Sequence, residues 1–445
     1  MNKEALFEAM NEIDEKYILE ASDISSPQKN KRIHYFRNLG LIAAGLLLIV
    51  GIGLLAIPSH KNNLIAGDDV PNVNTPDVNT PSVSTPDINT PETDTPNVQT
   101  PTVPSEYIAV EPTDSTSELA KLDIDTGSFY ETAMGFEGLM AYDVSELMDE
   151  SPWNKDISID TLPVFENVYD AEGSGIITNP DLTEMTAVLY EISTRFGLTP
   201  VEADFEYSMG MTDDGTEIPY AISYSENGIT LATESDLTTT VTFKPALTIP
   251  DQYNNTYKAS FKDVTEISDY FKSAYQHLLN MDSPITHIGS GDYDISASQF
   301  FTIHYYEDSA DFVTALLNNT FYNVQFYQNT ENSLDLIRFY RTDLSNLIGY
   351  YPIITWQEAE QLLINGNYIT TVPIDFPGKE YIKKTELIYR NGHMEDIYMP
   401  YYRILVELPS MYQEDTGLNT YGAYYVPAVK EEYLTNIPVW DGAFN

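Results

Sequence analysis

The sequence predicts an α+β fold carried on one transmembrane helix. An uncharged apolar run fills residues 39–58, and a proline–threonine repeat follows it. From about residue 105 onward, helix-period apolar stretches alternate with short β-type runs bounded by turns. This order predicts a membrane anchor, a stalk, and an exported domain of antiparallel sheets with helices packed on one face.

The apolar run LGLIAAGLLLIVGIGLLAIP is long enough to cross a bilayer. At ~1.5 Å rise per residue it spans roughly 30 Å, the thickness of the hydrocarbon core. Lys29, Lys31, Arg32 and Arg37 precede it, and only Lys61 follows closely. Positive charge stays on the cytoplasmic side, so residues 1–38 are predicted inside and residues 59–445 outside. A cleaved signal peptide is the alternative, and the 38 residues before the run disfavour it.

The cytoplasmic segment contains a predicted amphipathic helix over residues 3–22. Its apolar stripe consists of Leu6, Met10, Ile13 and Tyr17, spaced by 4, 3 and 4 residues. A lone helix of this length is marginal in water. The stripe therefore predicts a partner-binding surface for a cytoplasmic protein. A loose or membrane-lying helix is the alternative, which the acidic remainder of the helix disfavours.

Residues 59–104 are predicted to be a disordered stalk. Within 71–104 a proline recurs every five residues, usually after threonine. Proline fixes its own φ and biases the preceding residue toward extended conformations, so no core can form here. At ~3.1 Å per residue, a polyproline II segment of this length reaches roughly 100 Å. O-glycosylation of the threonines is a further alternative.

The remainder is predicted as two parts, 105–250 and 251–445. An Asn179-Pro180 start and Gly197 bracket the first helix, residues 263–280 form a second, and Thr355–Glu358 is a capping box for a third. The predicted strands are 219–224, 229–233, 238–243, 300–306, 320–327, 334–340, 385–389, 401–408 and 421–429. Residues 223–248 and 326–355 are loosely alike, so a duplicated helix-plus-sheet module is one version of the fold.

Composition excludes several classes of function. The chain has a net charge of −46, with 16 basic and 61 acidic residues after position 38. Such a surface repels phosphate backbones, so nucleic acid is not an expected partner. The chain has no cysteine, which excludes disulfides, thiol nucleophiles and lipidation at cysteine. The acidity itself is expected to keep an exported domain soluble.

No motif of established chemistry is present. H-E-x-x-H, G-x-S-x-G and the phosphate-binding glycine loops are absent, so no catalytic, cofactor-binding or metal-binding residue is predicted. The pairs Asp123/Asp125 and Asp292/Asp294 resemble fragments of calcium loops without the spacing of an EF-hand. The Tyr350, Tyr401 and Tyr424 doublets predict alternate rings in a core, or rings that stack on sugars or a peptide.

The N-terminal layout resembles anti-sigma-factor-like and uncharacterised single-pass membrane proteins of Gram-positive bacteria. The resemblance covers about the first 60 residues, from the helix LFEAMNEIDEKYILEA through the basic patch to the anchor. The exported part resembles PepSY-like or YycH/YycI-like ectodomains only in the order and spacing of its predicted helices and strands. The resemblance implies a sensor or regulator in the cell membrane, with a cytoplasmic partner such as a sigma factor. A cell-wall glycan or peptide is a candidate partner outside, since tyrosine rings can stack on such molecules. A surface scaffold without signalling and an exported carboxylate hydrolase are the alternatives.

Overall fold

The computed structural model describes one folded unit of the chain. The described residues are 106–107, 119–124, 152–169 and 177–442, with gaps at 213, 254–260, 290–301, 330–332, 371, 373, 393–394, 413–418 and 441. The chain divides into units 1–95 and 96–445, and all described residues belong to the second. The predicted tail, anchor and pentad repeat lie outside them. No helix among the described residues is long and apolar enough to span a bilayer.

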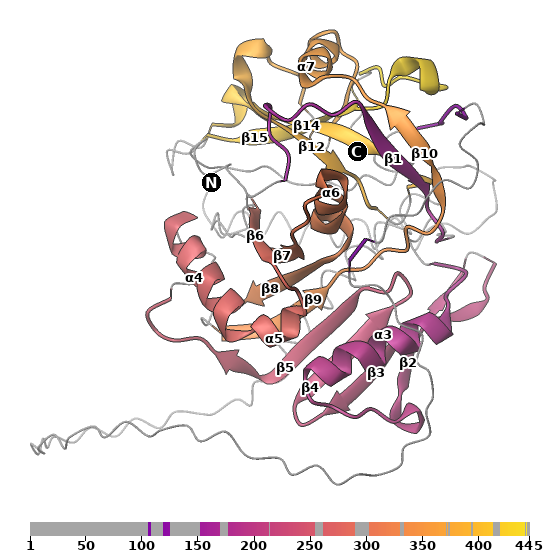
Figure 1. Cartoon of the computed structure of the whole chain (residues 1–445), viewed down its shortest axis with the longest axis vertical. Helices are drawn as coiled ribbons and strands as arrows, with labels where there is room; N and C mark the ends of the chain where they lie inside the picture. The colour runs from indigo at the N-terminus through magenta and orange to yellow at the C-terminus, as the bar shows by residue number, and fades with distance from the viewer. Residues whose placement is uncertain are drawn as a thin grey trace, which may run out of the picture. The chain divides into compact units, whose positions relative to one another are not determined.

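The predicted α+β class with antiparallel sheets is confirmed (Figure 1). The largest sheet has eight strands in the order β2-β3-β4-β5-β9-β8-β7-β6. These strands are β2 (Glu206–Met211), β3 (Glu217–Glu226), β4 (Ile229–Glu234), β5 (Thr239–Thr248), β6 (Pro284–Gly289), β7 (Thr302–Glu307), β8 (Asn323–Gln328) and β9 (Ser333–Phe339). The order is symmetric about the central β5–β9 pair, so residues 182–248 and 261–339 form two halves of similar topology.

The symmetry of the strand order is offset by one strand from the sequence likeness between residues 223–248 and 326–355. Residues 223–248 cover the end of β3 together with β4 and β5, whereas residues 326–355 run from β8 past β9. In the sheet, the counterpart of β4–β5 is β8–β9. The sequence also gives no strand at β2 or β6, which are the two outer strands of the sheet.

Helix α3 (Leu182–Arg195) packs on β3, β4 and β5 of the first half. The Asp181 side chain caps it by accepting from Thr183 N and Glu184 N. Its predicted apolar face is buried, including Met185, Val188 and Ile192. In the second half, the single predicted helix is two, α4 (Phe261–Ala274) and α5 (Gln276–Leu279), because Tyr275 leaves the helical backbone.

Helix α6 (Phe312–Phe321) corrects the predicted strand 320–327, since Thr320 and Phe321 end this helix and β8 begins at Asn323. Asp311 caps α6 through Thr314 N. The helix contacts β7 and β8 on one side and β12 (Ile382–Tyr389) on the other. It therefore lies between the eight-stranded sheet and the second sheet, as Figure 1 shows.

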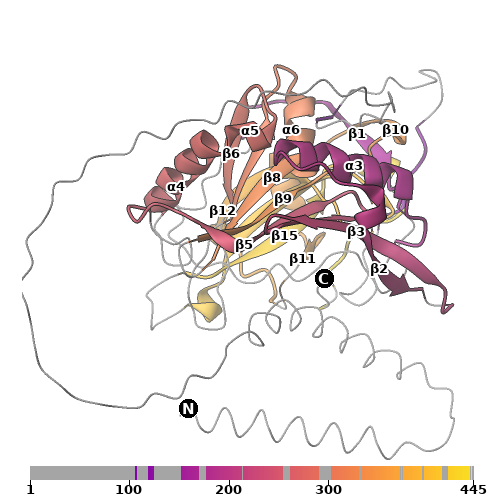
Figure 2. The ribbon, with the colours of Figure 1, turned by 90° about the horizontal axis from the view of Figure 1, so that it is seen from below.

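The second sheet has four strands in the order β11-β15-β14-β12. Its other strands are β11 (Ile369–Thr370), β14 (Pro400–Glu407) and β15 (Tyr421–Pro427), and helix α7 (Trp356–Ile364) packs on β14 and β15. A third sheet has the order β10-β1-β13, with β10 (Leu347–Pro352), β1 (Thr161–Glu166) and β13 (Ile397–Tyr398). Figure 2 shows β11, β12 and β15 of the second sheet and β1 and β10 of the third from below.

Both faces of the four-stranded sheet are buried. Along β14, Tyr401 and Leu405 belong to the apolar cluster shared with α3 and α4, whereas Tyr402 and Ile404 belong to the cluster with α6 and α7. The tyrosine doublets at 401 and 424 are therefore wholly in the core, and no ring of either stands on a solvent face. Alternation of side chains along a strand predicts that one face of the sheet is exposed to solvent. It cannot show that other elements cover this second face as well.

The earliest described residues attach to distant elements. Tyr107 N donates to Asn318 Oδ1 of α6 at 2.9 Å, and the Tyr107 ring packs edge-on against Phe165 with centroids 5.7 Å apart. Leu122 then forms a parallel bridge with Leu434, through bonds from Leu122 N to Tyr433 O and from Thr435 N to Leu122 O, both 2.8 Å. The start of the domain is thus held by α6 and by the C-terminal segment.

Candidate ligand-binding site

A pocket opens where β1 and β10 stop pairing. The two strands are antiparallel neighbours up to Thr161 and Pro352, and one further bond joins Ile353 N to Asp160 O at 3.0 Å. Beyond this bond the two chains separate, because Ile354 N turns to the Ala428 carbonyl at 2.8 Å. The separated segments enclose a cavity of about 230 Å³.

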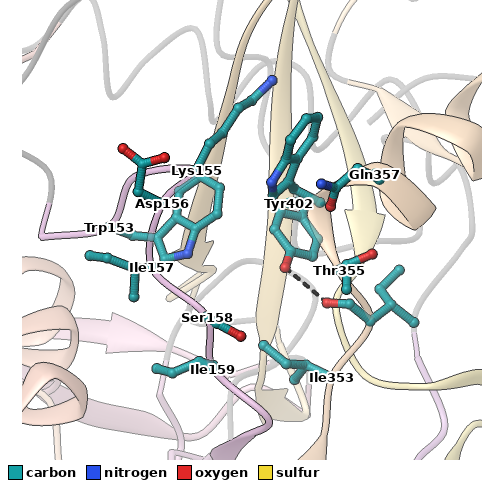
Figure 3. A pocket seen from close by; sticks show the side chains of 12 residues that line it. Trp153, Lys155, Asp156, Ile157, Ser158, Ile159, Ile353, Thr355, Gln357 and Tyr402 are labelled. Atoms are coloured by element: carbon teal, nitrogen blue, oxygen red, sulfur yellow. Dashed lines mark hydrogen bonds between the residues drawn. The ribbon is translucent and has the colours of Figure 1, made fainter.

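Aromatic side chains form the floor of this pocket (Figure 3). The Trp153 and Tyr402 rings meet edge-on, with centroids 5.8 Å apart at 70°. The Tyr402 hydroxyl donates to the Ile354 carbonyl at 2.9 Å, so the ring is fixed in place. Burial, followed by the charge of Glu358, raises the pKa of Tyr402 to about 12, and the hydroxyl stays a neutral donor.

The first turn of α7 forms one wall. The predicted capping box is confirmed: Thr355 Oγ1 accepts from Glu358 N at 3.3 Å, and Glu358 Oε2 accepts from Thr355 N at 2.7 Å. Hydrogen bonds from the Thr355 backbone and hydroxyl lower the pKa of Glu358. The cap fixes where the helix begins, and so it holds Trp356 and Gln357 at the rim of the pocket.

Lys155 connects the segment 153–159 with helix α7 across the pocket. Its Nζ lies 4.1 Å from the centroid of the Trp356 ring and 2.8 Å from Glu360 Oε1. Glu360 Oε1 also accepts from the Thr385 hydroxyl at 2.7 Å, which ties this carboxylate to β12. The ammonium therefore covers the indole by a cation–π contact while its charge is balanced from α7.

The lining combines indole rings with groups that donate and accept hydrogen bonds. Two of the chain's three tryptophans line it, together with the Asp156 carboxylate, the Ser158 hydroxyl and the Gln357 amide. Two further cavities, of about 310 and 820 Å³, lie between α7 and residues 426–437 and share Ile354 with this pocket. A mixed lining of this kind offers both ring surface and hydrogen-bonding groups to a small polar ligand.

A polar row crosses the eight-stranded sheet on the face away from its apolar core. Strand register places these residues opposite one another in the order Thr240, Arg338, Gln325, His304 and His287. The Arg338 Nε donates to Thr240 Oγ1 at 3.2 Å.

The two histidines at the end of the row share one acceptor. Asn319 Oδ1 of α6 lies 2.9 Å from His287 Nδ1 and 3.1 Å from His304 Nε2, and the two rings stack 4.2 Å apart. Desolvation by burial lowers the pKa of His304 to about 4 and holds that of His287 well below its usual range. The sequence does not indicate that these two histidines are neighbours. They are 17 positions apart, and only the pairing of β6 with β7 brings them together.

The buried carboxylates are held by cations. Arg403 Nε donates to Glu386 Oε2 at 2.8 Å, and Arg390 Nη2 lies 2.5 Å from Glu395 Oε1. Glu184 at the start of α3 differs, because burial first and the charge of Asp343 second raise its pKa. Among the residues that the structure describes, no group of three His, Cys, Asp or Glu is arranged to hold a metal ion.

The partner-binding residues predicted in the tail, Leu6, Met10, Ile13 and Tyr17, lie outside the described residues. So do Asp125, Asp292 and Asp294 of the two calcium-like pairs. Asp123 is described, and its Oδ1 accepts from Thr435 Oγ1 at 2.7 Å. Sequence reasoning missed the pocket, since Trp153 and Tyr402 are 249 positions apart.

No family model matches the chain, and no curated protein is significantly similar to it. Among solved structures, an uncharacterized protein from Eubacterium rectale ATCC 33656 matches 61% of this chain and 84% of its own. The two are 10% identical with a TM-score of 0.30, a likeness too low to support any argument.

Proposed function

We propose that this chain is a membrane-anchored sensor or regulator that binds a ligand outside the cell and reports to a protein partner inside. The observation that carries the proposal is the order of segments: a basic patch, the apolar run 39–58, the pentad repeat, and then a folded domain. The N-terminus is cytoplasmic and residues 59–445 are extracellular in this arrangement.

The topology is tested with protoplasts. Protease added outside should remove residues 105–445 and spare the tail. Digestion of the tail with survival of the domain would overturn the orientation.

The tail carries the regulatory part of the proposal, with a sigma factor as the kind of partner its layout fits. Each fully buried large apolar side chain contributes about 1.5–3 kcal/mol. Replacing Leu6 and Ile13 together by Asp should therefore weaken the cytoplasmic complex by about a hundredfold or more in a pull-down. The exchange of Glu4 and Glu8 for Gln is the matched control on the polar side. Wild-type binding by the Leu6/Ile13 variant would leave a surface scaffold without signalling as the function.

The Trp153–Trp356 pocket is proposed as the outside ligand site, with a cell-wall glycan or peptide as its ligand. Indole rings beside a carboxylate, a hydroxyl and an amide offer such molecules both apolar contact and hydrogen bonds. Titration with soluble cell-wall fragments should change tryptophan fluorescence, and Trp356→Ala should weaken binding by about tenfold or more. Trp440→Phe is the control, because Trp440 stacks on Tyr368 outside the pocket lining. Equal affinities for both variants would remove the pocket from the proposal.

An exported hydrolase is the second candidate, favoured only by Glu184. Burial, followed by the charge of Asp343, raises the pKa of Glu184, as the general acid of a hydrolase requires. Glu184→Gln would abolish hydrolysis of wall fragments if this candidate were correct, and would leave binding by the Trp pocket unchanged under the sensor proposal.

We further propose that the two halves of the eight-stranded sheet descend from one duplicated module. The symmetric strand order supports this, with a helix ahead of four strands in each half. Expression of residues 177–253 alone tests it: a descendant of an independent module should retain strand content by circular dichroism, and a fully unfolded fragment would argue against it.

A further inference from the structure

Strand β2 ends the eight-stranded sheet, and its outer edge has no partner strand among the residues that the structure describes. It is held from behind by pairing with β3 and, at its start, by the Phe205 ring packed on Tyr190 and Tyr224. Figure 2 shows β2 at the margin of the sheet, beyond β3. A free strand edge offers a row of backbone donors and acceptors to another chain.

Large apolar side chains stand exposed along this strand. Tyr207, Met209 and Met211 occupy alternate positions and are 46%, 48% and 60% exposed. Val201 just ahead of the strand and Tyr220 on β3 are exposed as well. Natural edge strands usually carry lysine or proline to prevent pairing, and β2 carries neither. An edge of this kind marks an interaction site.

The charge around the edge is of one sign. From Gly197 to Phe243 the sequence holds nine acidic residues and no lysine, arginine or histidine. Glu206 and Glu217 are exposed at the two ends of the β2–β3 pairing. A second copy of the chain would bring two such acidic surfaces together, which like-charge repulsion opposes. The complementary occupant is cationic.

We propose that β2 is a docking strand for an extended polypeptide segment that alternates apolar and basic side chains. The segment pairs with the outer edge of β2 through backbone hydrogen bonds and lays its apolar side chains on Tyr207, Met209 and Met211. Its lysines or arginines lie against Glu206, Glu217 and the acidic loops beside them. This interface is separate from the Trp153–Trp356 pocket and goes beyond the ligand site proposed above.

The test uses the full-length chain in lipid nanodiscs and a fluorescent peptide of about eight alternating lysine and valine residues, read by anisotropy. A glutamate–valine peptide should not bind. A lysine–valine peptide N-methylated at alternate residues keeps its charge but loses the donors of one edge, and it should bind about tenfold more weakly or worse.

Protein variants locate the site. Met209→Lys with Met211→Lys should weaken binding of the lysine–valine peptide by about tenfold or more. Met411→Lys with Tyr412→Lys adds the same charge at exposed apolar residues elsewhere and should leave binding within about twofold. Thermal melts of both variants verify that each is folded.

Three outcomes would overturn the proposal. Equal binding of the N-methylated peptide, or equal weakening in both variants, would show charge attraction without strand pairing. Sedimentation showing a dimer that the Met209/Met211 variant abolishes would identify a second copy as the occupant. Failure of the lysine–valine peptide to bind the wild-type chain would exclude the cationic strand itself.

Discussion

The two halves of the eight-stranded sheet share a strand order and differ in one connection. In the first half, β3 and β4 are joined by the two-residue turn Asn227-Gly228, with φ values of 52° and 80°. In the second half the matching connection, between β7 and β8, contains the whole of α6. The same face of one sheet is therefore closed by a helix in one half and left without that helix in the other.

This difference decides the chemistry of each half. Under α6, the polar row ends in His287, which is buried, and His304, which is partly buried, and Asn319 holds both. At the first half's end of the sheet, Ser223 is partly exposed and Glu206 is exposed. Helix α6 covers the polar sheet face here together with β12 and β14, whose Glu386 and Arg403 lie near His287.

The largest expected effect comes from the acceptor that α6 supplies. Asn319→Ala leaves two buried imidazole N–H groups without their acceptor, so the free energy of unfolding should fall by about 3 kcal/mol. Ser223→Ala on the first half should change it by less than about 0.5 kcal/mol. Urea denaturation measures both, and a loss below about 1 kcal/mol for Asn319→Ala would show that the histidines are not held as described.

The second expected effect is a dependence on pH. A depressed folded-state pKa means that the unfolded chain takes up protons first, so stability is lost as pH falls below about 6.5 and continues to fall toward pH 4. Between pH 7 and pH 5, His304 alone should lower the free energy of unfolding by about 2 kcal/mol.

Substitutions assign this slope to the second half. In the double variant His287→Gln with His304→Gln, the free energy of unfolding should depend less steeply on pH over that range. In His277→Gln, which changes an exposed residue, it should depend on pH as in the wild type. An unchanged slope in the double variant would contradict the assignment.

A third comparison concerns the two turns of the first half. A Cβ at Gly228 would lie 2.4 Å from the Lys244 carbonyl oxygen, whereas a Cβ at Gly215, between β2 and β3, meets nothing within 4 Å. Both glycines have positive φ. Gly228→Ala should therefore destabilise by about 2 kcal/mol and Gly215→Ala by about 1 kcal/mol. Equal losses of stability for the two variants in thermal melts would mean that the turn at Gly228 shifts to accommodate the added Cβ.

The smallest expected effect is at the edge. Met209→Lys with Met211→Lys changes exposed side chains only, so the free energy of unfolding should stay within about 0.5 kcal/mol of the wild type. A loss above about 1.5 kcal/mol would show that these side chains pack within the domain, and the edge would then not be free.

Local signals in the sequence were sufficient for the elements that depend on them. The Asn227-Gly228 hairpin, the face of α3 and the Thr355–Glu358 cap are each specified by a few adjacent residues. The α6 segment FVTALLNNTF carries β-branched and aromatic residues at both ends, which favour a strand at its C-terminal end. Tertiary packing against β7, β8 and β12 decided otherwise.

The candidate site could not be read from the chain because its parts meet only through pairing of remote strands. Trp153 reaches Tyr402 only after β1 has joined β10, and Thr161 pairs with Pro352. The same reason hides the His287–His304 pair. Strand β2 is not among the strands predicted from the sequence. Its run EYSMGM alternates apolar and polar residues, but it is only six residues long and contains methionine and glycine in place of β-branched residues.

The attachment of Tyr107 to α6 sets how the domain bears mechanical load. Tension on the chain ahead of residue 106 enters through the Tyr107 N bond to Asn318 and the ring contact with Phe165, before it reaches any strand of the first half. Asn318 Nδ2 donates to the Glu307 carbonyl at 3.0 Å, and this hydrogen bond transmits the force to the end of β7. The neighbouring residue, Asn319, holds both histidines. A stretched tether would thus load α6 and the end of β7 before it loads the β2 edge.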